Sequence, residues 1–197
     1  MKKIIYFLAF LCQFTYSQTK KSTDGFMIEP VFRINAVKTN QFGDNFLAKA
    51  NQPDLGFSIE FGFLKYKKIT STLDYNYNYF SVTDIEKAGN INSTRFSSFG
   101  AKILYEIDVY KKFSLQPYFG IGNPTLNFKS SSTSFGEQKG NDYKLGFYVN
   151  CNLDKTLAFS FGTEYNWAKY NIETVPELVE FYKNSNAIKI TLGIRLR

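Results

Sequence analysis

The chain has 197 residues, a formal net charge of +7 and no histidine, so the commonest general base and a common metal ligand are missing. Aromatic residues make up 18% of the chain, with 14 Tyr and 21 Phe, and no apolar stretch is long enough for a membrane-spanning helix. The basic excess is scattered, and part of it falls in short turns, which indicates solvated turns and no nucleic-acid partner.

The N-terminus has the layout of a secretory signal peptide. Lys2 and Lys3 precede an apolar run of about nine residues, 4–12, and Thr15 and Ser17 occupy the small-residue positions of a cleavage site. A membrane anchor is the alternative, but the run is too short to span a bilayer. We therefore expect a cleaved signal peptide at 1–17, a short periplasmic segment at 18–23 and one domain at 24–197.

Eight segments of about ten residues then alternate apolar and polar side chains, the period of a strand with two different faces. They cover residues 26–35, 55–63, 69–79, 98–107, 113–121, 143–151, 157–167 and 187–197. The apolar faces together offer about forty positions, and none of them carries a charge. Because a Lys or Arg that faces lipid at midplane costs roughly 2–4 kcal/mol, a membrane barrel should exclude charge from that face.

The opposite faces carry five acids and five bases, which the sequence predicts to form a charge network in the lumen: Glu29, Arg33, Glu60, Asp74, Lys102, Glu106, Lys144, Glu164, Lys189 and Arg195. A soluble β-sandwich or lipocalin-like barrel would reverse this arrangement, with apolar side chains inside and charges in water. Alternation alone does not say which face lies inside.

The spacing between the segments favours the membrane barrel. Long gaps at 36–52, 81–93, 123–141 and 169–185 alternate with short ones at 66–68, 109–112 and 152–155, as in barrels with long extracellular loops and short periplasmic turns. Tyr75, Tyr165 and Trp167 lie toward the long gaps, whereas Phe63 and Tyr105 lie toward the short ones. Aromatic rings at both interfaces are typical of such barrels, so the predicted fold is an all-β, eight-stranded antiparallel up-and-down transmembrane β-barrel.

From residue 24 to 197 the chain resembles the small single-domain OmpA/OmpX-like outer-membrane barrels of Gram-negative bacteria. The last segment, 187–197, is similar to the C-terminal strand that outer-membrane assembly machinery recognises, although it ends in Arg197 where an aromatic residue is usual. The resemblance implies an outer-membrane location, with outer-membrane lipid and the assembly machinery as partners.

An eight-stranded barrel is just wide enough for its own side chains to fill it. We expect acids and bases to pair across the lumen, Asp74 with Lys102 and Glu164 with Lys144 or Lys189, because lone buried charges are costly. Inward glycines leave room for Tyr118 and Tyr148 to cross the interior.

This arrangement predicts a plugged envelope scaffold that presents its loops to an extracellular or envelope protein partner. A narrow porin-like channel for small solutes is the alternative, and a soluble periplasmic ligand-binding barrel is a third. With no histidine in the chain, we expect no catalytic site, and no cofactor or metal site either.

The fourth long gap carries the clearest helix signal. Residues 174–177 (TVPE) match a capping box with Pro in the first turn, and a short apolar stripe follows at Leu178, Val179, Phe181 and Tyr182. We expect a helix of one or two turns that packs on the barrel rim. The same stripe is also the candidate surface-contact patch, because loops on rigid scaffolds often carry recognition.

Overall fold

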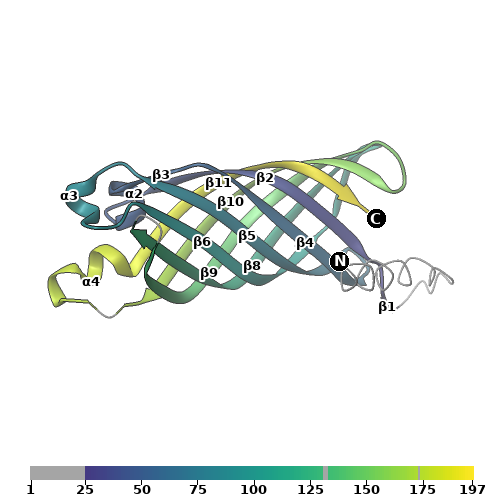
Figure 1. Ribbon diagram of the computed structural model, residues 1–197. Coiled ribbons are helices and arrows are strands. Elements are labelled where there is room, and N and C mark those ends of the chain that lie inside the picture. The colour runs from purple at the N-terminus through teal and green to yellow at the C-terminus, as the bar shows by residue number, and fades with distance from the viewer. Residues whose placement is uncertain (1–24, 131–132, 173) are drawn as a thin grey trace, which may run out of the picture.

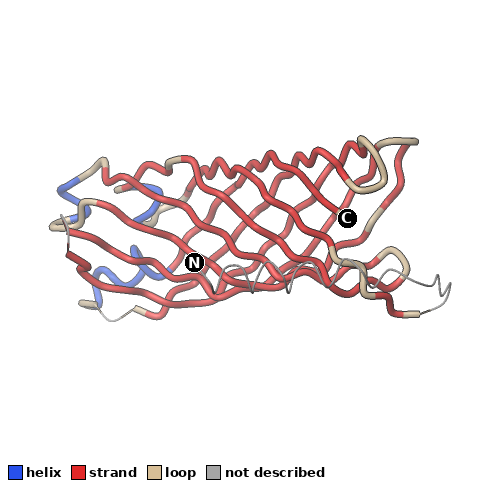
Figure 2. The backbone as a smooth tube through the Cα atoms, turned by 45° about the vertical axis from the view of Figure 1, so that its right-hand side comes forward, coloured by secondary structure: helices blue, strands red, loops and turns tan. Residues whose placement is uncertain are grey.

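The computed structural model describes residues 25–130, 133–172 and 174–197, which form an antiparallel barrel (Figures 1 and 2). The predicted signal peptide and the segment 18–23 lie outside these residues. Eight long strands build the wall: β2 (Val31–Phe42), β4 (Leu55–Tyr66), β5 (Ile69–Val82), β6 (Ser93–Tyr105), β8 (Phe113–Ser130), β9 (Thr133–Asn152), β10 (Leu157–Asn171) and β11 (Asn184–Leu196). Three short strands extend it: β1 (Phe26–Met27), β3 (Asn51–Pro53) and β7 (Ile107–Tyr110).

Each long strand pairs with the long strands before and after it in the chain, and the barrel closes between β11 and β2. This closing ladder runs in continuous antiparallel register from Phe32 opposite Leu196 to Phe42 opposite Asn186. A closed ladder pairs the backbone groups of every long strand on both sides, which the interior of a lipid bilayer demands. The predicted eight-stranded up-and-down topology is confirmed.

The two faces of the wall differ as the alternation predicts. Outward side chains in the middle of the strands are apolar and exposed, for example Leu192 at 64%, Leu145 at 63% and Phe159 at 53% of their full area. Inward neighbours such as Lys144 and Lys189 are charged and buried. Apolar groups outside and charges inside are the arrangement of a barrel whose solvent is lipid.

The connections at the two ends are different. Short turns join the strands at the end where the C-terminus lies, and Lys67 adopts a positive φ of 54° in the first of them. The other end carries the three short helices α2 (Phe46–Lys49), α3 (Ile85–Ala88) and α4 (Pro176–Lys183) (Figure 1). Over the described part of the chain, no helix has both the length and the apolar character needed to cross a bilayer. The helical end is the one predicted to be extracellular.

Two of the predicted long loops are largely wrong. The first gap, 36–52, is strand up to Phe42, and the third, 123–141, is almost entirely strand because β8 runs to Ser130 and β9 starts at Thr133. In both regions a ladder continues through residues predicted to be loop, with Phe42 opposite Asn186 and Thr125 opposite Lys139. Their polar composition reflects strand faces that leave the membrane, where an outward apolar side chain has no advantage.

The start of α4 also differs from the prediction. Val175 is the N-cap residue, no side chain caps the helix, and Pro176 occupies its first turn. The predicted capping box on Thr174 is therefore wrong. The fixed φ of proline, which suits the first helical turn, is the feature of this motif that the helix start does use.

Candidate functional site: the charged lumen

Glu60 on β4 is the centre of the lumen. Its carboxylate accepts a hydrogen bond from Arg33 at 2.6 Å and one from Lys102 at 2.7 Å, and the Tyr148 hydroxyl also donates to it. Both of its charged partners have side chains no more than 2% exposed. A buried carboxylate is tolerated only when it is paired and hydrogen-bonded, and Glu60 meets both conditions.

Glu164 on β10 forms the second group. Lys189 lies 3.1 Å from one carboxylate oxygen and Lys102 lies 3.1 Å from the other, and the Tyr118 hydroxyl donates to it at 3.0 Å. Lys102 therefore contacts both Glu60 and Glu164 and links strands β4, β6 and β10 across the interior. Of the two bases suggested for Glu164, the structure places Lys189 beside it.

The other suggested base, Lys144, lies in a third group. It donates to Asp74 at 2.7 Å, whereas the Asp74 to Lys102 distance is 3.9 Å. Lys144 also lies 3.8 Å from Asp142, which directly precedes the predicted segment 143–151 and is absent from the predicted lumen charges. Asp142 is fully buried and accepts a hydrogen bond from Ser98 at 2.9 Å. Continuing the β9 alternation beyond Lys144 would have placed Asp142 inside.

Two tyrosines cross the lumen between these groups. The Tyr118 and Tyr148 rings stack at 4.7 Å, and the Arg33 guanidinium lies 3.8 Å from the Tyr148 ring centre. A Cβ added at Gly146 would lie 2.7 Å from the Tyr118 side chain, and one at Gly162 would lie 2.5 Å from Tyr148. Real Cβ atoms do not approach so closely, so these glycines make the space that the two rings occupy.

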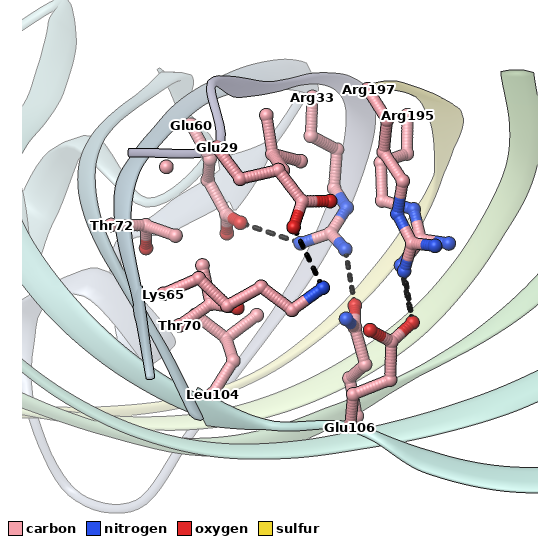
Figure 3. A pocket seen from close by; sticks show the side chains of 13 residues that line it. Glu29, Arg33, Glu60, Lys65, Thr70, Thr72, Leu104, Glu106, Arg195 and Arg197 are labelled. Atoms are coloured by element: carbon pink, nitrogen blue, oxygen red, sulfur yellow. Dashed lines mark hydrogen bonds and ion pairs between the residues drawn. The ribbon is translucent and has the colours of Figure 1, made fainter. Parts of the chain in front are cut away.

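The mouth at the short-turn end has its own set of ion pairs, shown in Figure 3. Glu29 pairs with Lys65 at 2.8 Å, Glu106 pairs with Arg195 at 3.3 Å, and Arg197 also contacts Glu106. The cavity between them measures about 20 Å³. That volume is enough for about one water molecule.

The helical end is closed by an apolar cluster, which we call the cap and which the sequence did not predict. Its buried residues come from α2, from α3 and the segment after it, and from the inward faces of the long strands: Phe46, Leu47, Ala50, Phe80, Ala88, Ile91, Phe96, Leu126, Phe128, Ala168 and Tyr170. The signal was present in residues 125–129, TLNFK, where the alternation continues with the apolar residues on the inward face.

The predicted α4 stripe is divided between the cap and the solvent. The Tyr182 ring stacks on Phe46 at 4.8 Å, and Phe181 meets Phe46 edge-on at 6.1 Å. Leu178 is 43% exposed, and Val179 is half-buried. Two members of the stripe therefore hold the helix to the barrel, and Leu178 remains open to a partner.

The carboxylates of the lumen are occupied by bases. Among the residues with described positions, no group of three or more His, Cys, Asp and Glu side chains is arranged to hold a metal ion. The chemistry that the lumen supports is therefore ionic cross-linking of the wall, by pairs that lie between 2.6 and 3.9 Å apart.

No protein-family model and no curated protein matches the chain. Among solved structures, Neisserial surface protein A (NspA) aligns with a TM-score of 0.66 at 15% identity, over 88% of this chain and 99% of that one. Ail, the attachment invasion locus protein of Yersinia pestis, aligns with a TM-score of 0.51 at 14% identity, over 88% of this chain and all of that one. With its closed ladder and apolar outer belt, this chain has the fold of the small eight-stranded β-barrels of the outer membrane.

Proposed function

We propose that the protein is a non-catalytic scaffold of the outer membrane, closed to solutes by its lumen charges, that presents its helical end to a partner at the cell surface. The observation that carries the proposal is the burial of the whole central network, in which Glu60 and Glu164 share Lys102. A conducting pore needs hydrated walls, whereas these side chains contact one another in place of water.

Two layers support closure. The stacked pair Tyr118 and Tyr148 crosses the interior at the level of Glu60, and the cap fills the barrel beyond it. Moving a solute through would require several buried ion pairs to open together. Removing one partner of such a pair costs roughly 3–5 kcal/mol, so spontaneous opening is rare.

The construction of the helical end supports the presenting role. Leu178 on α4 and Ile85 on α3, which is 73% exposed, stand on short helices packed against a rigid barrel. Connecting segments that a rigid scaffold positions often carry recognition. NspA and Ail are themselves described as a surface protein and an attachment protein.

Conductance in planar lipid bilayers tests the closed lumen. The wild-type barrel should give no large, stable conductance, and a Tyr118→Ala/Tyr148→Ala variant should show frequent openings because it removes both rings from the lumen. Tyr75→Ala/Tyr165→Ala is the matched control, since it removes two outward tyrosines. Large and stable wild-type currents would favour the narrow-channel function instead.

The presenting end is tested by labelling in a Gram-negative host. An Ile85→Cys variant, made in a Cys151→Ser background, should react with a membrane-impermeant maleimide on intact cells. A cysteine at Lys155, in the turn between β9 and β10, should react only after the cells are opened. The reverse pattern would invert the proposed orientation and remove the surface role.

A further inference from the structure

The outer wall of the barrel has a hollow that the scaffold role does not use. It measures about 340 Å³ and lies across β5, β6, β8 and β9, with Leu73, Ala101, Ile121 and Tyr143 among its lining residues. These four side chains all face outward and are exposed. The volume falls within the range of small-molecule sites, about 300–1,000 Å³.

The depth arises from small residues in the wall. Ala101 lies between two larger outward positions of β6, Phe99 and Ile103, and faces Ile121 across the ladder. Gly100 and Gly122, the inward neighbours of these positions, also line the hollow, and the Asp74 and Asp142 side chains pack directly behind them. The part of the hollow nearer the short turns is thus an apolar surface of a shape that an acyl chain can fill.

The edge of the hollow nearer the helical end is polar. The Asn123 amide donates to Asn141 at 3.3 Å, and both residues are exposed and line the hollow. Lys169 is the register partner of Asn141 on β10, and Lys139 lies two residues beyond Asn141 on the same outward face of β9. The two amides therefore border the apolar floor, and the two lysines face outward on the wall next to them.

Charge at this edge is positive. Lys139 and Lys169 face outward beside it, and the outward acid Glu137 pairs with Lys139 at 2.9 Å. That pair is exposed and therefore weak. The hollow is also lined by the buried acid Asp142, which lies 3.8 Å from the inward Lys144. Lys139 and Lys169 against Glu137 leave an excess of one positive charge, at the height where an aromatic pair, Tyr143 stacked on Trp167 at 5.3 Å, is typical of a membrane interface.

We propose that this hollow is a binding site for one anionic lipid of the surrounding leaflet, with an acyl chain on Ala101 and Ile121 and the phosphate beside Lys139 and Lys169. The occupant is a lipid because the apolar floor lies on the membrane face of the barrel. It is anionic because the polar edge carries excess positive charge. The proposal rests on insertion of the barrel into a bilayer and is independent of whether the lumen conducts.

Trp167 is the only tryptophan of the chain and lies beside the site, so its fluorescence reports the neighbouring lipid. The protein is refolded into phosphatidylcholine vesicles that contain a minor fraction of chain-brominated phosphatidylglycerol or, in parallel, chain-brominated phosphatidylcholine. The anionic probe should quench Trp167 more strongly, with a preference of about fivefold for each interacting lysine. Equal quenching by the two probes overturns the proposal.

Two variants with matched controls locate the site. Lys139→Gln/Lys169→Gln should abolish the preference, whereas Lys112→Gln/Lys155→Gln removes the same charge from the short turns and should retain it. Ala101→Leu fills the hollow and should reduce the preference, whereas Ala36→Leu, at an exposed outward position on β2, should not. Equal losses in a variant and its control would also overturn the proposal.

Folding is followed by heat-modifiable gel migration of each sample. A wild-type protein that never reaches the folded, membrane-inserted form would contradict the membrane location itself. Inserted protein without lipid preference contradicts only the lipid site.

Discussion

The inward face of this barrel is built in two opposite ways along its length. From the short turns up to the level of the outward pair Tyr143 and Trp167, the inward face is ionic, with Glu60, Lys102 and Glu164 in direct contact. Nearer the helical end the inward face is apolar, with Phe46 and Phe128 in T-shaped contact at 5.5 Å inside the cap. The outward face changes in the opposite direction at the same height, from apolar to polar.

Strand β8 shows the reversal within one segment. On the outward face, Phe119 and Ile121 lie within the apolar belt, and the polar Asn127 lies beyond it. On the inward face the order is reversed: the polar Gln116 lies at the level of the belt, and the apolar Leu126 lies beyond it. The medium outside the wall explains the change. Where lipid surrounds the barrel, the polar groups are inside; where water surrounds it, the apolar groups are inside, as in any soluble protein.

The largest expected effect is loss of a shared acid in the ionic half. Glu164→Gln leaves Lys102 and Lys189 without one of their counter-charges, so the free energy of unfolding should fall by about 3–5 kcal/mol. Equilibrium urea unfolding in lipid vesicles measures this change. The exposed Glu137→Gln is the control, with an expected change of roughly 0–1 kcal/mol. Equal effects of the two variants would mean that an ion pair in the lumen contributes no more to the free energy of unfolding than an exposed pair does.

The apolar half is tested by Phe46→Ala, which removes a buried ring that contacts Phe128, Phe181 and Tyr182. Such truncations cost about 3–5 kcal/mol in a packed core, and we expect the lower end because the cap lies at a rim. The loss should appear as faster proteolysis around 42–53, with heat-modifiable migration of the barrel unchanged. Loss of the folded gel form would show instead that the cap and the barrel unfold as one unit.

The outer face in the belt is tested by Leu192→Lys. Facing lipid, the new charge should destabilise the barrel by roughly 2–4 kcal/mol. The same residue introduced at Asn127, which faces outward beyond the belt, should change the stability little. If both variants unfold at the wild-type urea concentration, water surrounds both positions and the two-medium explanation fails.

The smallest effect concerns a helix outside the membrane. Asp84 caps α3, and the Lys87 side chain and backbone hydrogen bonds lower the pKa of its carboxyl. Because the carboxyl has a lower pKa in the folded state, its ionised form stabilises α3 at pH values above about 3.9, the ordinary pKa of Asp. This stabilisation is lost as the pH falls through the folded-state pKa. The protection factor of the Lys87 amide hydrogen, which compares its exchange with the intrinsic rate at the same pH, should therefore fall in acid, and Asp84→Ala should remove this pH dependence. An unchanged profile in that variant would exclude the cap as its cause.

Alternation and the absence of charge from one face were enough to predict the eight strands and their order. The cap was missed because residues 125–129 reverse the pattern and read as a polar loop. The sequence also did not predict which acid pairs with which base in the lumen. Lys144 lies opposite Gly120 and near Asp74, and this placement depends on the stagger between strands, which no single-strand pattern contains.

The ladder between β2 and β11 has a consequence for how the molecule is made. It joins the first and last long strands, so the barrel has two open edges until both strands are in place. In hydrocarbon, the backbone groups along those edges would have no hydrogen-bond partners. Insertion of the strands one by one is therefore unfavourable, and closure of the ladder between β2 and β11 is the step that makes the wall compatible with lipid.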